Sequence, residues 1–122
     1  MKDEEVRDLR ERTREYALRV IRLSEALPKS ATGKVLGMQV LRAGTSVGAH
    51  YREAHRARSN AEVISKLEGA LQELDEASYW LELIGDAKLL PPERLQALID
   101  ETNELIAILV TMVKRVKTRV KR

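Results

Sequence analysis

Apolar residues recur at steps of three and four along four stretches of the chain, which is the spacing of one face of an α-helix. The pattern predicts helices over about residues 3–27, 31–56, 59–87 and 92–120. No stretch shows the strict alternation of a half-buried strand. Because the expected connections are short, we expect the helices to pack as antiparallel neighbours. The sequence therefore predicts an all-α fold, an antiparallel up-and-down four-helix bundle, built as a single domain over residues 1–122.

Each expected helix carries one stripe of residues that we assign to the core. The stripes comprise Val6, Leu9, Thr13, Tyr16, Val20, Leu23 and Leu27; Leu36, Val40, Ala43, Val47, Tyr51 and Ala54; Leu67, Leu71, Leu74, Ser78 and Leu81; and Leu95, Leu98, Thr102, Leu105, Leu109, Val113, Val116 and Val120. In the third helix, Val63, Ala70, Ala77 and Ile84 flank the stripe. Gly37, Gly44 and Gly48 lie beside the second stripe. Each glycine costs about 1 kcal/mol of helix propensity relative to alanine, so we expect a close approach there, inside the bundle or across a subunit contact.

The expected helix ends rest on prolines and on one capping pattern. Pro28 ends the first helix, because proline disfavours helical geometry at the residue before it. Ser59-Asn60-Ala61-Glu62 is typical of a capping box, in which the serine and glutamate side chains each accept an orphan backbone N–H. Pro91 and Pro92 open the fourth helix, where the missing N–H is harmless.

The fourth helix is apolar on more than one face. Ile99, Ile106, Ile108, Val110 and Met112 surround its main stripe. A helix that is apolar on most sides must be covered on most sides, and a lone bundle covers one stripe per helix. We therefore expect a homo-oligomer.

The chain offers little catalytic chemistry. It contains no cysteine, which excludes thiol nucleophiles and cysteine metal sites. His50, Glu53 and His55 do not have the spacing of a zinc-protease motif, and no phosphate-binding glycine loop or nucleophile beside a base is present. We expect no enzyme activity, no metal and no cofactor. The chain has neither a signal peptide at Met1–Glu5 nor an apolar run that would span a membrane, so we expect a cytoplasmic protein with no membrane partner.

Charge is distributed in three blocks, although the net charge is only +3. Residues 1–58 carry 13 basic and 8 acidic side chains. Residues 59–104 carry 3 basic and 11 acidic side chains, and residues 105–122 carry 6 basic side chains and no acidic one. Such blocks indicate a dipolar surface, pairing between protomers, or solvated helix faces whose charges segregate by helix.

The strongest functional signal is basic. The candidate nucleic-acid-binding residues are Arg52, Arg56, Arg58, Lys114, Arg115, Lys117, Arg119, Lys121 and Arg122. The negative end of a helix macrodipole needs only one or two cations, whereas the last nine residues hold six. Lysine and arginine at this density suit phosphate contacts. A solvated helix end, or contact with an anionic membrane or protein, remains an alternative reading.

The segment from Leu41 to Ala54, followed by Arg58, Ser59 and Glu62, resembles the four-helix-bundle proteins encoded in intervening sequences of bacterial 23S ribosomal RNA genes. The matching positions are Arg42, Ala43, Ser46, Glu53, Arg58, Ser59 and Glu62, whereas His50, Tyr51, Arg52, Ala54 and Val63 depart from the family pattern. The resemblance implies a homopentameric ring. The same family includes the accessory variability determinant proteins of diversity-generating retroelements, which implies binding to nucleic acid and to a reverse transcriptase.

Two functions follow as hypotheses. The first is a non-enzymatic oligomeric bundle that binds RNA or DNA mainly through backbone phosphates. The second is a protein–protein adaptor that docks on a reverse transcriptase or another partner, because the acidic block at residues 59–104 repels nucleic acid and attracts a basic protein.

Overall fold

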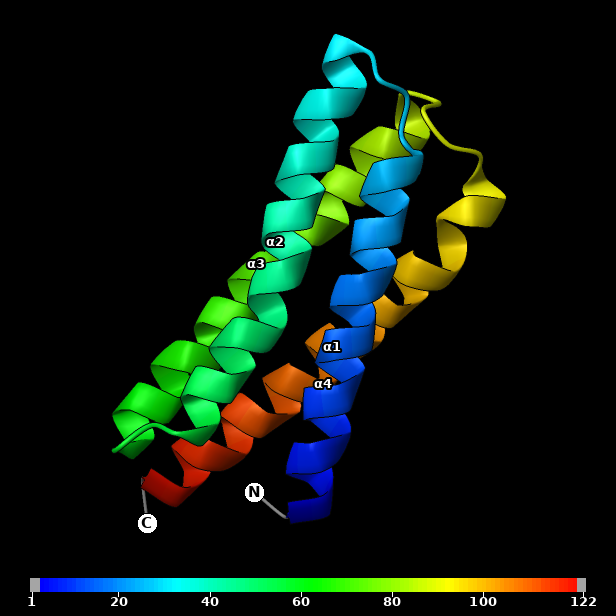
Figure 1. Cartoon of the computed structure of the whole chain (residues 1–122). Helices are drawn as coiled ribbons and strands as arrows, with labels where there is room; N and C mark the ends of the chain where they lie inside the picture. Colours follow the sequence, from blue (N-terminus) through cyan, green and yellow to red (C-terminus); the bar gives the residue numbers. More distant parts are fainter. Residues whose placement is uncertain (1–2, 121–122) are drawn as a thin grey trace.

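Four long helices make up the fold in the computed structural model, which describes residues 3–120 (Figure 1). They are α1 (Asp3–Ala26), α2 (Ala31–His55), α3 (Asn60–Asp86) and α4 (Gln96–Val120), with a short 3-10 helix, η1 (Pro92–Arg94), before α4. The chain runs up α1, down α2, up α3 and down α4, so the two ends of the described chain lie at the same end of the bundle (Figure 1). The expected all-α fold with four helices is confirmed. Within residues 3–120, no helix is both long and apolar enough to cross a bilayer.

The helix ends follow the capping signals with two differences. Ser59 caps α3, with its hydroxyl accepting from Glu62 N at 3.1 Å. Glu62 reaches back to Arg58 N at 3.4 Å, one residue earlier than the capping box requires. The fourth helix does not begin at residue 92, since Pro92 opens only the 3-10 turn η1. The N–H of Leu95 bonds to the carbonyl oxygen of Pro92 at 3.0 Å, and its side chain turns into the core before α4 begins.

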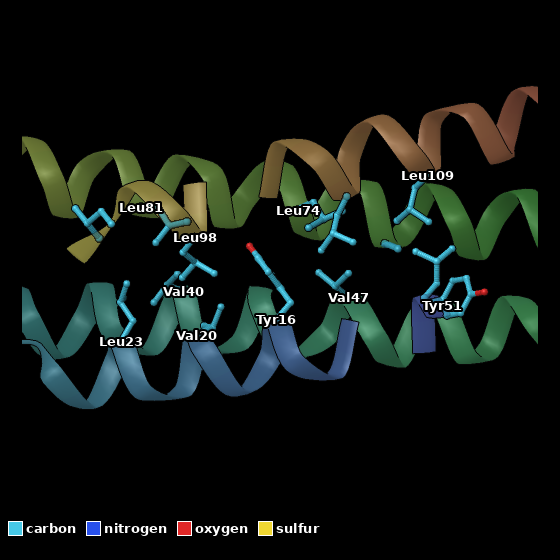
Figure 2. Close-up of a cluster of buried hydrophobic side chains, with 14 of the residues drawn as sticks. Tyr16, Val20, Leu23, Val40, Val47, Tyr51, Leu74, Leu81, Leu98 and Leu109 are labelled. Carbon is cyan, nitrogen blue, oxygen red and sulfur yellow. The ribbon is translucent and has the colours of Figure 1, made fainter. Parts of the chain in front are cut away.

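The core is a continuous column of side chains between the helices. Leu23, Val20, Val40, Leu81 and Leu98 fill one end, Tyr16, Val47 and Leu74 the middle, and Tyr51 and Leu109 the other end (Figure 2). The stripes expected on the first two helices are buried at every position. On α4 the stripe is buried except at Val120, which is 54% exposed, and Met112 is buried in addition.

The stripe expected on the third helix is rotated. Ala70, Ala77 and Ile84, which were assigned to its flank, are fully buried, whereas Leu71 and Ser78 are only half-buried. The cause is unequal packing, because α3 lies more closely against α2 than against α4. The small side chains of Ala70 and Ala77 allow that approach, and the α3 face turned to α4 is covered less completely.

The glycines of α2 allow α1 to approach it closely. A Cβ atom at Gly44 would lie 2.7 Å from Cγ2 of Val20, and one at Gly48 would lie 3.2 Å from Oγ1 of Thr13. Real Cβ atoms essentially never come within 3 Å of a neighbour, so Gly44 is needed for this packing. The close approach therefore lies inside the bundle, between α1 and α2.

α4 crosses α1 obliquely and touches it over a short stretch (Figure 1). Polar contacts hold the two helices together there. Arg12 donates two hydrogen bonds to Glu101, at 2.9 and 2.8 Å, and lies 3.1 Å from Glu104. The hydroxyls of Tyr16 and Thr102 are 2.7 Å apart in the buried interior.

The apolar surplus lies elsewhere than expected. Ile99, Ile106 and Ile108 of α4 pack against the core and are half-buried. The most exposed large apolar side chains in the described part of the chain, apart from Val120, are Met38 at 71%, Val35 at 58% and Tyr79 at 53%. Apart from Val120 at the end of α4, the exposed large apolar side chains of the described residues are thus on α2 and α3.

Candidate nucleic-acid interface

The two basic clusters of the sequence come to one end of the bundle. Because α2 and α4 both run downward, their C-terminal turns lie at the same end (Figure 1). We call this surface the basic end; its described members are Arg52, Arg56, Arg58, Lys114, Arg115, Lys117 and Arg119, and all seven are exposed. Two further candidates, Lys121 and Arg122, lie outside the described residues. Residues about sixty positions apart in the sequence therefore lie at the same end of the bundle.

Part of the positive charge at this end compensates the helix termini. The last carbonyl groups of α2 and α4 carry the negative pole of each helix, and lysine or arginine in the last turn compensates it. Arg52 lies in the last turn of α2, and Lys117 and Arg119 lie in the last turn of α4. Arg58 lies beyond α2 in the link to α3 and has no carbonyl pole to compensate. The cations therefore exceed what the helix ends require, which leaves charge for a ligand.

Carboxylates from the other two helices also reach this end. Glu5 of α1 accepts a hydrogen bond from Arg115 at 3.1 Å, and Glu68 of α3 lies 3.6 Å from the ammonium of Lys117. These partners are far away in sequence, and the charge blocks contained no signal that would have found them. Both side chains of the Lys117–Glu68 pair are about half exposed, so that pair contributes little stability. Glu5 is more sheltered, with 28% of its side chain exposed.

The other five basic side chains have no such partner. Among the side chains of residues 4–120, no carboxylate oxygen lies within 4 Å of Arg52, Arg56, Arg58, Lys114 or Arg119. Beside them, Glu53 pairs with Lys66 of α3 at 2.8 Å. The hydrogen bond from Lys66 lowers the pKa of Glu53, and Glu53 in turn raises the pKa of Lys66. That pair neutralises itself and leaves the arginines available.

The histidines do not form a site. His55 is exposed, whereas His50 is half-buried against α3. A Cβ atom at Gly69 would lie 3.0 Å from Nδ1 of His50, so Gly69 makes room for the imidazole ring. No group of three or more metal-binding side chains gathers in the described part of the chain.

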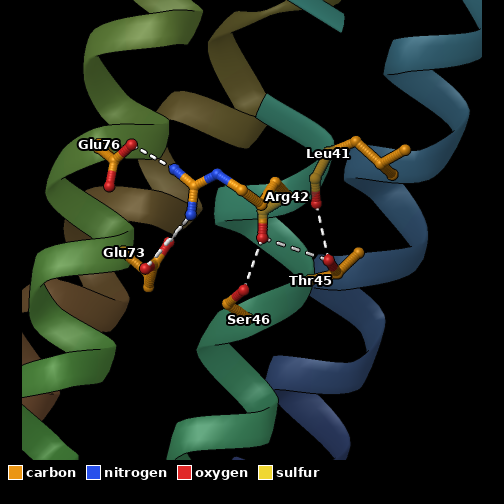
Figure 3. A network of polar contacts seen from close by, with 6 residues as sticks. All are labelled: Leu41, Arg42, Thr45, Ser46, Glu73 and Glu76. Carbon is orange, nitrogen blue, oxygen red and sulfur yellow. Dashed lines mark hydrogen bonds and ion pairs between the residues drawn. The ribbon is translucent and has the colours of Figure 1, made fainter. Parts of the chain in front are cut away.

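Arg42, at the start of the family-like segment, holds α2 to α3. Its guanidinium donates to Glu73 at 3.1 Å and also bonds Glu76 (Figure 3). Ser46 donates to the carbonyl oxygen of Arg42 at 2.7 Å, inside the same helix. The segment thus contributes to helix packing, and its basic members at the far end, Arg52 and Arg58, belong to the basic end.

The comparisons agree with this architecture. The family model of the 23S rRNA-intervening sequence protein matches residues 7–111. A crystal structure of a protein of unknown function from the S23 ribosomal protein family of Bacteroides thetaiotaomicron superposes with a TM-score of 0.81 at 34% identity, over 86% of this chain and 97% of that one. No curated protein sequence matches the chain. With most of its length matched by the family model, this chain belongs to the 23S rRNA-intervening sequence protein family.

Proposed function

We propose that this chain is a non-enzymatic, cytoplasmic helical-bundle protein that binds RNA or DNA mainly through backbone phosphates at the basic end. The position of the α2 and α4 clusters at the same end of the bundle is the observation that supports it most. Among the side chains that the structure describes, five of these cations have no acidic oxygen within 4 Å and two are held by one carboxylate each, so this end of the bundle suits several phosphates at once. The aromatic side chains are too few to stack on bases, so recognition rests on charge.

The salt dependence of binding tests this proposal. If the six basic residues of the last nine each neutralise a phosphate, log affinity falls against log salt with a slope of roughly −4 to −5 per engaged protomer. Replacing Lys114, Arg115, Lys117 and Arg119 by glutamine should make the slope shallower by about three. The matched control replaces four exposed basic residues away from this end, Arg14, Lys29, Lys34 and Lys88. Equal slopes for the two quadruple variants would contradict the assignment to the basic end.

The bundle is proposed to act as a homopentameric ring. Met38, Val35 and Tyr79 supply exposed apolar surface on neighbouring helices, which a second copy would cover. Light scattering should give a mass near five times 13.8 kDa, and Met38→Glu should lower it, with Thr111→Glu on α4 as the control. A monomeric wild-type protein would contradict the ring.

A second candidate function is docking on a basic protein such as a reverse transcriptase. Glu68, Asp75 and Glu82 are exposed on α3 and follow one another at seven-residue intervals, so they line one face of the helix. Such an acidic line complements a basic partner and repels nucleic acid. A reverse-transcriptase gene beside this one favours the adaptor, whereas a position inside a ribosomal RNA gene favours the first function.

A further inference from the structure

A cavity of about 230 Å³ lies between α1 and the start of α4, at the end of the bundle opposite the basic end. Its polar lining consists of three arginines, Arg19, Arg22 and Arg94. Its apolar lining consists of three leucines, Leu23, Leu90 and Leu98, and of Ala97. The cavity thus combines concentrated positive charge with an apolar wall.

The three arginines have no carboxylate partner. Within residues 3–120, none of them has an acidic oxygen within 4 Å. Arg19 is half-buried, and charged groups withdrawn from water are usually paired. Three guanidinium groups around one cavity also repel one another. The free protein therefore holds a cluster of cations that an anion would stabilise.

A comparison with Arg12, two turns earlier on α1, shows which acidic partners Arg19 lacks. Seven residues before Arg19, on the same face of α1, Arg12 is bound by Glu101 and Glu104. Seven residues before those two acids, the chain has Arg94 and Ala97, and both line the cavity. At the position of α4 that would supply a carboxylate to Arg19, the protein has the methyl group of Ala97, and a third arginine, Arg94, lies just before it in η1. Between α1 and α4, acidic side chains thus bind Arg12, whereas no described acidic side chain binds Arg19, which is left to an external anion.

We propose that this cavity binds a phosphate monoester attached to a small apolar or aromatic group. A guanidinium group can donate two parallel hydrogen bonds to two oxygens of one phosphate. A phosphate monoester carries close to two negative charges at neutral pH. The positive pole at the first turn of α4, where Ala97 lies, adds to the attraction. The leucines contact the organic group. The volume is below the roughly 300–1,000 Å³ of sites for drug-sized ligands, so the ligand is small.

Calorimetric titration at low salt tests the ligand class with three probes: phenyl phosphate, inorganic phosphate and benzoate. Phenyl phosphate should bind at least about tenfold more tightly than either of the others, because only it uses both the arginines and the leucines. Absence of phenyl phosphate binding would overturn the proposal. Equal binding of benzoate would overturn the phosphate specificity, and equal binding of inorganic phosphate would overturn the role of the apolar wall.

Two variants test the location. Arg19→Gln should weaken phenyl phosphate binding at least about tenfold, whereas Arg14→Gln, an exposed arginine elsewhere on α1, should leave it unchanged. Ala97→Glu supplies the missing carboxylate, so it should abolish binding while raising the melting temperature. A stabilised protein that loses the ligand has not lost it by unfolding, and unchanged binding in Ala97→Glu would contradict the site.

The same variant separates this cavity from the basic end. Ala97→Glu should leave the salt slope of RNA or DNA binding unchanged, because the two surfaces lie at opposite ends of the bundle. If Ala97→Glu instead lowers that slope as much as the Lys114, Arg115, Lys117 and Arg119 replacements, the cavity contacts nucleic-acid phosphates and the small-ligand proposal is wrong.

Discussion

Tyr16 donates a hydrogen bond to Oγ1 of Thr102 across 2.7 Å, and both side chains are fully buried. The direction of the bond follows from the second contact of Thr102, whose only hydroxyl proton goes to the carbonyl oxygen of Leu98 at 2.8 Å. Tyr16 must therefore be the donor. The bond satisfies a buried phenol and ties α1 to α4, where the two helices share little apolar contact.

Removing the donor and removing the acceptor of this bond should lower the free energy of unfolding by different amounts. Thr102→Val leaves the Tyr16 hydroxyl buried without an acceptor and should lower the free energy of unfolding by about 1–3 kcal/mol. Tyr16→Phe leaves Thr102 still bonded to Leu98 and should cost about 1 kcal/mol. Urea unfolding of both variants and of the double variant measures the difference. A double variant whose loss equals the sum of the two single losses would contradict the coupling.

Alkaline pH should destabilise the protein through the same residue. Burial raises the pKa of Tyr16 to about 12, and the hydrogen bond with Thr102 only partly offsets it. The ordinary tyrosine value is about 10. Because the folded pKa is higher than the unfolded one, this stabilisation is complete below pH 10 and is lost as the pH rises towards 12.

The expected loss over that interval is about 2–3 kcal/mol, from 1.36 kcal/mol per tenfold change in proton affinity. Unfolding free energies of wild type and Tyr16→Phe at several pH values measure it, and the gap between the two proteins should change by this amount. Tyr51, whose pKa burial also raises to about 12, is present in both proteins and cancels. A constant gap from pH 9 to pH 12 would contradict the prediction.

Gly44→Ala should destabilise the bundle despite the better helix propensity of alanine. The new methyl group would lie 2.7 Å from Val20 Cγ2, and such overpacking costs about 1–3 kcal/mol, against a propensity gain of about 1 kcal/mol. Adding Val20→Ala should recover part of the loss by making room. Gly37→Ala is the control, because its methyl group would meet the flexible end of Leu27 at 3.3 Å and the carbonyl oxygen of Ser24 at an ordinary contact distance of 3.8 Å. Thermal unfolding that ranks Gly37→Ala below Gly44→Ala would refute this reading.

The two acids bound to Arg12 should differ in importance. Glu101 makes a paired contact with Arg12 and its side chain is 14% exposed, whereas Glu104 makes one contact and is 65% exposed. Glu101→Gln should therefore cost about 1–3 kcal/mol of unfolding free energy, and Glu104→Gln less than about 0.5 kcal/mol. Added salt should weaken the Glu104 contribution first. Equal losses for the two variants would show that burial does not decide the strength of this pair.

The sequence identified the basic residues of the candidate interface, but not the acidic residues that lie among them. Arg52, Arg58 and Lys117 stand out in the sequence because basic residues gather around them, without any acid in the last nine residues. Their gathering at one end follows from the up-and-down order of the helices. Glu5 and Glu68 could not be assigned to that end, because a pairing between helices depends on how each one is rotated and displaced along its neighbour.

The sequence alone determined the helices and most of the core, because both depend on local spacing. Stripes at steps of three and four, Pro28, and the Ser59 cap are properties of residues a few positions apart. The rotation of α3, which buries Ala77 and leaves Ser78 half-buried, depended on tertiary packing, because neighbouring stripes satisfy the same period equally well. The partners of the α1 arginines also depended on tertiary packing. Arg12 faces two carboxylates and Arg19 faces none among the described residues, because the crossing of α1 and α4 decides which residues face each arginine.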